Sequence, residues 1–475
     1  MARSRLILAL PVLALPVGLT FAKGGYFDVP RLAAGVIACA LVVVAAVATK
    51  RPLPRERAPR LALLGLAALT AWTGASLAWA PIAGVAGDDL QRLLLYLATF
   101  TAALALLPPA RRIVEPVLLA GIVAAALYGL SERLLPGVFE LQTLPSANDR
   151  LAWPLTYWNA MGALMGMGLV LAAATRNRVA AAAAPLLGLA LYLTFSRGAL
   201  GATAVGVAAL LALEPTRERL TRTLLVAVAA AIPALATFAL GDLERPGGSA
   251  AQGAAMLALL AVTSAAAAAL FPKEGLSLFR KHPRFFQPAV RIDPHEPKEG
   301  QSLFMLRAVA IGVLVLALGA TIVLSTSGGP TETPANAEAS RLLSTQSNRD
   351  EYWRVALSTF AEHPLNGAGS GAFRTEWLRE REIPEAVRDA HSLYFETAAE
   401  LGLVGLAALA LFLGGIVGMA RRNPQAGAVA ALVVYAAHAG LDWDWELPAL
   451  TLFALVLAAR LADEAPSADA RPAPS

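Results

Sequence analysis

Two kinds of side chain in this sequence can act on a phosphate-bearing substrate at a membrane surface. Arg197 ends a strongly apolar stretch, where a guanidinium can clamp a phosphate or pyrophosphate through two parallel hydrogen bonds. His391 begins another apolar stretch, where an imidazole can accept a proton from a reacting hydroxyl. The polar segment between them, residues 326–390, carries further candidate anion contacts: Arg349, Arg354, Arg374 and Arg388.

Each of these residues also has a simpler interpretation. Arg197 can be an anchor that extends to the lipid headgroups, although a charge at a membrane edge is by default a candidate functional group. His391 can be an interfacial histidine with satisfied hydrogen bonds, and both interpretations stay open. Most loop arginines can pair with neighbouring glutamates, so we expect only one or two to touch substrate. Arg349 opposes the dipole of the helix it would begin.

The predicted helix after residue 390 determines how His391 is presented. If Asp389 or Ala390 caps this helix, His391 lies in its first turn, and the helix N-terminus keeps the ring neutral. Helical geometry then determines which side chains share its face. Those on the His391 face are Tyr394, Phe395 and Ala398, whereas Glu396 and Glu400 point away, towards a neighbouring span.

The elements that position these residues are transmembrane helices. Hydrophobic residues make up 57% of the chain, charged residues 15%, and mean hydropathy is +0.59, whereas a soluble domain carries about 25% charged residues. The fold class is an all-α polytopic transmembrane helical bundle of about 12–14 spans with one large external loop containing short helices. The predicted spans are 5–22, 32–49, 61–80, 91–107, 112–133, 158–175, 179–196, 198–213, 223–241, 250–271, 307–325, 391–420, 426–440 and 448–462.

Basic residues follow alternate spans, which places those connections and both termini in the cytoplasm. The same distribution argues against nucleic acid as a partner, because the charges form no groove-like patch. We interpret the first apolar run as a retained span. The single cysteine, Cys39, excludes an intrachain disulfide.

Four regions follow from this topology. Residues 1–325 hold transmembrane helices with a basic cytoplasmic loop near 272–306, residues 326–390 form the external (periplasmic) loop, residues 391–462 hold the C-terminal transmembrane helices, and residues 463–475 form a disordered cytoplasmic tail. In the external loop a helix begins near Asn348 with Glu351 as its capping partner, and a second spans about Phe373–Arg381. His363–Gly371 makes a turn between them.

The last external connection is Asp442-Trp443-Asp444-Trp445-Glu446. An Asp-x-Asp pair holds a divalent ion in metal-dependent sugar-nucleotide transferases. Here the two tryptophans are typical of an aromatic belt at the membrane interface. We therefore predict neither a metal nor another cofactor.

Four segments in order resemble the O-antigen ligase and polymerase family of bacterial envelope enzymes, over roughly residues 150–460. They are Tyr157-Trp158-Asn159-Ala160-Met161-Gly162, Thr194-Phe195-Ser196-Arg197-Gly198-Ala199, Arg354 through Pro364-Leu365-Asn366-Gly367-Ala368-Gly369, and Ala390-His391-Ser392-Leu393-Tyr394 with Glu400-Leu401-Gly402-Leu403-Val404-Gly405. The Asp442 turn also fits the closing spans of the family.

The resemblance implies a metal-independent glycosyltransferase in the bacterial cytoplasmic (inner) membrane, with its active site on the external side. Its donor would be a glycan linked through pyrophosphate to undecaprenol, and its acceptor a glycan, lipid or protein. Arg197 and a loop arginine would bind the diphosphate, Tyr394 is a further candidate substrate contact, and His391 would orient or deprotonate the acceptor hydroxyl.

A transporter or flippase of a lipid-linked saccharide is the main alternative. It predicts charged or broken-helix positions deep in the spans, whereas most spans here are uniformly Ala, Leu and Val. A membrane protease is disfavoured because Gly369-Ser370-Gly371 lies in the external loop. Ligase and polymerase activities are not separated by the sequence.

Overall fold

The computed structural model describes residues 2–49, 52–237, 239–271 and 347–462. These ranges contain helices and no β-strand, which confirms the predicted all-α class. Four predicted segments lie outside the described residues: the basic loop near 272–306, the span 307–325, the first part of the loop 326–390 and the tail 463–475. Six helices are long and apolar enough to cross a membrane: α2 (Asp28–Ala48), α4 (Ala83–Leu106), α5 (Arg111–Leu134), α10 (Arg217–Ala236), α11 (Ala250–Leu270) and α16 (Leu393–Arg422).

Further helices complete the bundle. They are α1 (Ala2–Phe21), α3 (Arg57–Ser76), α6 (Trp158–Ala174), α7 (Arg178–Ala181), α8 (Ala184–Leu193), α9 (Arg197–Leu213), α17 (Ala426–Ala439) and α18 (Pro448–Arg460). The predicted span 179–196 is divided between two helices, α7 and α8, and each other predicted span in the described ranges overlaps one α-helix. Several apolar helices are only 10–17 residues long. The prediction had taken every span to be near the length that a bilayer demands.

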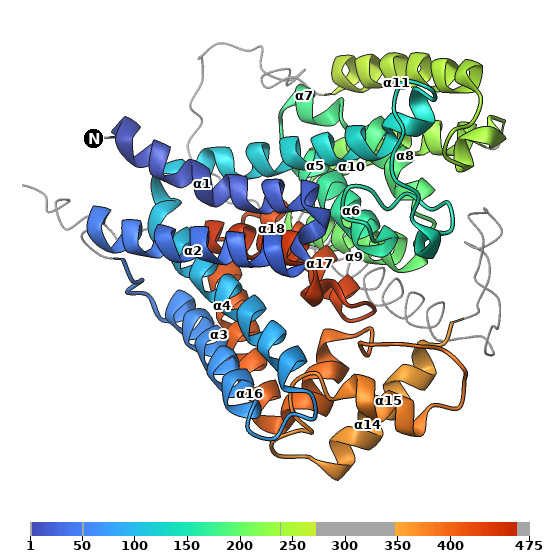
Figure 1. The fold of residues 1–475 in the computed structure, drawn as a ribbon. Helices are drawn as coiled ribbons and strands as arrows, with labels where there is room; N and C mark the ends of the chain where they lie inside the picture. Colours follow the sequence, from blue (N-terminus) through green and yellow to red (C-terminus); the bar gives the residue numbers. More distant parts are fainter. Residues whose placement is uncertain (1, 50–51, 238, 272–346, 463–475) are drawn as a thin grey trace, which may run out of the picture.

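Two groups of helices meet along α18 (Figure 1). In the first group α16 packs along α3, and α3 along α4; in the second, α6, α9 and α17 pack against one another. Helix α18 contacts both α4 and α17, and its residues 448–459 are all buried. A helix that is apolar on every side belongs inside such a bundle.

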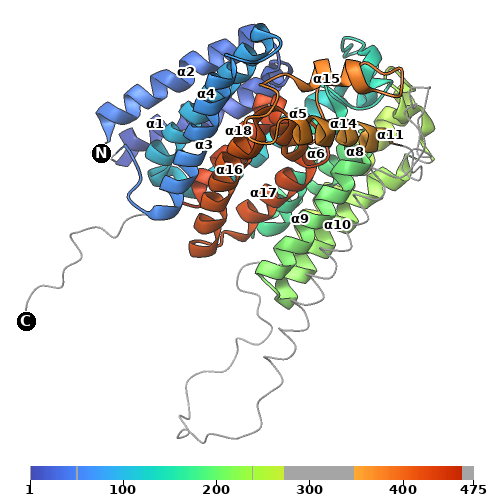
Figure 2. The ribbon, with the colours of Figure 1, turned by 90° about the horizontal axis from the view of Figure 1, so that it is seen from below.

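The described part of the predicted external loop contains both predicted helices, α14 (Arg349–Glu362) and α15 (Phe373–Glu380). They lie near one end of α16, as both views show (Figures 1 and 2), around a small core that includes Tyr352 and Trp377. The predicted capping partnership at the start of α14 is wrong. Asn348 donates to Glu385 at 2.8 Å, and Glu351 pairs with Arg354 at 2.7 Å, because both side chains find partners within the loop.

Helix α16 is interrupted at Gly402, whose φ of 63° and ψ of −159° are not helical. The turn 364–371 fills the break and satisfies the backbone groups that it frees. This exchange explains how an irregular backbone is accommodated inside an apolar bundle. The hydrogen bonds run from Leu403 N to Pro364 O at 2.8 Å, from Val404 N to Leu365 O at 3.2 Å, from Ala368 N to Ala399 O at 2.9 Å and from Gly369 N to Glu400 O at 2.9 Å.

Replacing Gly402 with alanine should therefore loosen the external loop. An alanine Cβ would meet the carbonyl oxygen of Leu365, and the backbone conformation is one that L-residues rarely adopt; together these should cost about 1–3 kcal/mol. The purified Gly402→Ala protein is expected to melt at a lower temperature and to be cleaved faster by protease within residues 347–390. The control is Gly414→Ala in the same helix, where nothing lies within 4 Å. Equal melting temperatures for the two variants would contradict this account.

Candidate functional site

A buried carboxylate, Asp442, lies at the centre of a polar network on the turn between α17 and α18. Its side chain accepts hydrogen bonds from Tyr157 Oη at 2.6 Å, Asn159 Nδ2 at 2.6 Å and Arg349 at 2.7 Å. The backbone N–H of Trp443 donates a fourth at 3.0 Å. Tyr157 and Asn159 come from the start of α6, and Arg349 is the first residue of α14. The network therefore joins the external loop to the ends of the bundle helices.

The charge of Asp442 is stabilised by its surroundings. Burial by itself raises the pKa of Asp442, but attraction to Arg349, His391 and His438 outweighs burial and holds the pKa below its usual range. The carboxylate is therefore ionised at neutral pH and orients the guanidinium of Arg349. The Nε of Arg349 has no hydrogen-bond partner among the described residues. The ion pair with Asp442 explains why an arginine can begin α14, although its charge is unfavourable at a helix N-terminus.

His391 lies beside this network, outside any helix. Its ring contacts that of Tyr352, with centroids 5.0 Å apart, and its Nδ1 lies 3.0 Å from the carbonyl oxygen of Asp389. A carbonyl oxygen only accepts, so this contact is a hydrogen bond when Nδ1 carries the hydrogen. In the neutral ring Nε2 is then the proton acceptor. Burial raises the pKa of Asp389 itself, and the charges of His391 and Arg92 oppose that rise.

The predicted position of His391 in the first turn of α16 is wrong. Ser392 caps the helix instead, with its Oγ 3.5 Å from Phe395 N, and His391 has a φ of 51°. The prediction that Tyr394 and Phe395 share a helix face with His391 is therefore also wrong. Tyr394 points to α17 and donates to the carbonyl of Ala436 at 3.0 Å, whereas Phe395 packs on Trp353 of α14.

Arg197 is the first residue of α9 and is partly buried. Ser196 caps this helix, accepting from Ala199 N at 3.2 Å. The next residue, Gly198, packs against His438 of α17, since a Cβ there would lie 3.4 Å from Nε2. His438 Nδ1 in turn lies 2.5 Å from Asp444 Oδ2. These contacts place the start of α9 against the helix that leads into the Asp442 turn.

The other predicted loop contacts occupy different places. Arg354 is on the surface, paired with Glu351, and its side chain is 42% exposed. Arg388 is exposed. Arg374 is partly buried, and its charge acts on Asp389. The structure therefore gathers Arg349 and His391 around Asp442, and it does not gather Arg354 or Tyr394 there.

Sequence reasoning underestimated Asp442, which it treated as half of a weak metal-binding pattern. In the structure Asp442 binds Arg349, while Asp444 binds His438, so the two carboxylates serve separate partners. Among the described residues no three His, Cys, Asp or Glu side chains are arranged to hold a metal ion. The available signal was an acidic pair in a short external turn that has no basic residue of its own.

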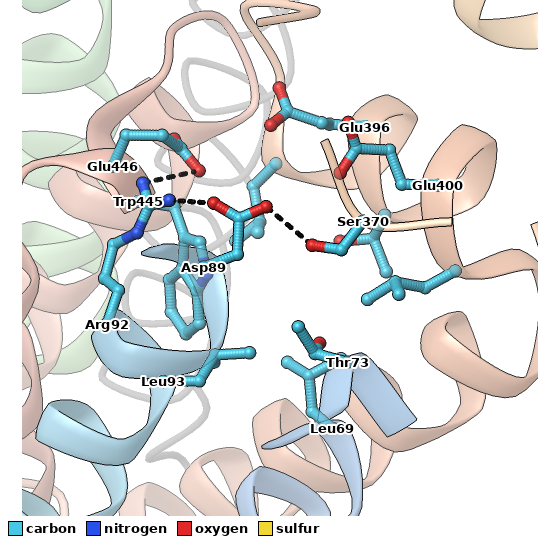
Figure 3. Close-up of a pocket in the computed structure, with 13 residues that line it drawn as sticks. Leu69, Thr73, Asp89, Arg92, Leu93, Ser370, Glu396, Glu400, Trp445 and Glu446 are labelled. Atoms are coloured by element: carbon cyan, nitrogen blue, oxygen red, sulfur yellow. Dashed lines mark hydrogen bonds and ion pairs between the residues drawn. The ribbon is translucent and has the colours of Figure 1, made fainter. Parts of the chain in front are cut away.

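A small cavity lies between α3, α4, α16 and the turn 364–371 (Figure 3). Its volume is about 40 Å³, enough for a few water molecules and too small for a sugar. Glu396 and Glu400 were predicted to meet a neighbouring span. Both line this cavity together with residues of α4, and both also accept hydrogen bonds from the loop backbone. Glu400 accepts from Gly371 N at 2.8 Å and Phe373 N at 3.0 Å, and Glu396 from Ala390 N at 2.8 Å.

Apolar helices of membrane length, a helical loop against their ends and a buried ionic network between the two define a multi-pass membrane protein with a polar site at the ends of its helices. The model of the O-antigen ligase family matches residues 251–410 of the chain. This match confirms the resemblance found in the sequence. It includes Arg349, His391 and the break in α16, and it ends before the Asp442 turn. No curated protein matches the chain.

Proposed function

We propose that the protein transfers or polymerises glycan from an undecaprenyl-pyrophosphate-linked donor, without a metal ion, on the external face of the cytoplasmic membrane. The family supports a glycan-transferring enzyme. The observation that carries the proposal is the Arg349–Asp442 pair beside His391. It combines an oriented cation with a proton acceptor at the ends of helices that can span a bilayer, where the diphosphate of a lipid-linked donor would lie.

In the proposed reaction Arg349 and Arg197 bind the diphosphate and stabilise the charge that develops on the leaving group. The acceptor oxygen attacks the anomeric carbon of the donor glycan. The bond from that carbon to the phosphate oxygen breaks, and undecaprenyl pyrophosphate leaves with the electron pair. His391 Nε2 takes the proton of the acceptor hydroxyl. The acceptor is a glycan, a lipid or a protein; Arg354, Arg374, Arg388 and Tyr394 stay predictions as substrate contacts.

One observation favours the alternative, a flippase or transporter of the same lipid-linked saccharide. Transporters use broken helices to bind substrate, and α16 is broken at Gly402. Here, however, the loop segment 364–369 occupies the freed backbone groups of α16. The break therefore serves to attach the loop, which favours the transferase.

The two functions are separated by a reconstitution experiment. The purified protein is placed in liposomes with a fluorescent oligosaccharide on undecaprenyl pyrophosphate and candidate acceptors, and the products are resolved on a gel. A ladder of repeat units indicates a polymerase, and a single shifted band indicates a ligase. Movement of the donor between leaflets without a covalent product would reject the transferase and support the flippase.

Within this assay, Arg197→Ala should lower transfer about 100-fold, because one of the two cations on the diphosphate is lost. The expected loss appears in both kcat and kcat/KM for the donor, since the charge develops in the transition state. Arg379→Gln is the matched control, a loop arginine with a 57% exposed side chain that pairs only with glutamates nearby. Normal transfer by a correctly folded Arg197→Ala protein would remove this residue from the proposed site.

A further inference from the structure

We infer that Asp89, Arg92 and Glu446 form a brace that positions the external loop against the turn carrying Asp442. The inference rests on the proposed function, because it concerns how the same site is assembled. The three residues act through others and are positioning residues. Asp89 and Arg92 lie on α4, and Glu446 lies between α17 and α18.

One end of the brace holds the external loop. Ser370 Oγ donates to Asp89 Oδ2 at 2.6 Å, and Ser370 N donates to Ser76 Oγ of α3 at 3.2 Å. Ser370 belongs to the turn that fills the break in α16, and its side chain points towards Asp89 (Figure 3). Asp89 is thus the point on α4 to which this turn is attached.

The other end holds the Asp442 turn. Arg92 is ion-paired with Asp89, and its second amino group lies 3.4 Å from Glu446 Oε1 (Figure 3). One turn further along α4, Tyr96 Oη donates to the carbonyl of Trp445 at 2.5 Å. A guanidinium is a rigid planar fork, so the two carboxylates it joins keep a fixed spacing.

The loop and the turn are therefore joined twice. Ser370 reaches the turn through the brace, and Arg349 reaches it directly through Asp442. Both joints are largely buried: Arg92 is 9% and Glu446 11% exposed, and Asp442 is fully buried. Buried polar contacts are stronger than exposed ones, so loss of one joint should shift the geometry of the other. The brace then determines how Arg349 faces the donor.

The test compares Ser370→Ala, Glu446→Gln and the double variant in the glycan-transfer assay. Each single change should lower kcat about tenfold, because small misplacement of charged groups is costly, with donor KM within about threefold. The kcat of the double variant should lie within about threefold of the kcat of the less active single variant, since both changes break the same connection. Ser370→Thr, which keeps the hydroxyl, should restore activity, and Ser131→Ala is the control, since the Ser131 hydroxyl bonds only the carbonyl of Tyr128 nearby.

Hydrogen exchange gives a second readout that does not depend on activity. Ser370→Ala should speed amide exchange in residues 441–447, to which the brace connects Ser370, as well as in 364–371. The brace would be overturned if amide exchange in residues 441–447 stayed unchanged. It would also be overturned if the losses in kcat of the two single variants multiplied in the double variant. Absence of transfer by the unmodified protein would instead reject the proposed function, and exchange would still decide about the brace.

Discussion

Asp442→Asn should lower glycan transfer at least about 100-fold and also reduce stability. Asp442 accepts from Tyr157, Asn159 and Arg349 at once. Asparagine has a single acceptor oxygen and turns an N–H₂ group towards one of these donors. It also leaves the buried cation of Arg349 without its counter-charge, a loss of about 3–5 kcal/mol for a broken buried pair. Donor binding and kcat should both fall, because the oriented guanidinium is lost.

Asp242→Asn is the matched control for this change, because Asp242 is exposed and, among the described residues, bonds Gln252 and its own turn. Melting curves of the two variants separate loss of fold from loss of site. The lowered pKa of Asp442 adds a pH test. Its contribution to stability is present above the unfolded pKa of about 4 and is lost as pH falls through the folded value. The Arg349–Asp442 ion pair should therefore persist between pH 5 and 8. Normal transfer by the Asp442→Asn protein would reject the proposed site.

His391→Asn should lower kcat about 10²–10⁴-fold, the contribution typical of a positioned general base. Asparagine removes the proton acceptor at Nε2 and tolerates the positive φ of this position better than most residues. The donor KM should change little, because Arg197 and Arg349 keep their positions. The measurement is steady-state transfer in liposomes at saturating donor.

His363→Asn tests whether any loop histidine would show the same loss. His363 is exposed at the end of α14, away from the Asp442 network, and transfer by this variant should stay within about twofold of the unmodified protein. Transfer by His391→Asn at the unmodified rate would show that His391 is not the base. Loss of donor binding in His391→Asn would assign the residue to binding rather than to proton transfer.

The helices were predictable because hydropathy and length are local properties of the sequence. Every predicted span within the described residues overlaps a helix, although 179–196 is divided between α7 and α8. The His363–Gly371 turn and both loop helices lie where glycine, proline and apolar periodicity indicated. Helix ends were less predictable. The sequence predicted a cap at Asp389 or Ala390, whereas Ser392 caps α16 in the structure.

Arg197 and His391 could be identified as candidates because a cation or an imidazole at a membrane edge needs an explanation from its own position. Which loop arginine meets the Asp442 turn could not be identified. Arg349 and Arg354 both lie in the first half of α14, yet Arg349 meets Asp442, 93 residues away along the chain, and Arg354 meets Glu351, three residues away. Local spacing favours the second pair and contains no information about the first.

The sequence by itself determined an all-helical membrane protein with a polar loop before its last helices, because apolar length and charge distribution act along the chain. The tertiary structure decided that the loop enters the break at Gly402, that Asp442 orients Arg349, and that Ser370 reaches Glu446 through α4. These contacts join segments distant in sequence. They form because a buried donor or charge must find a partner wherever the packed helices bring one within reach.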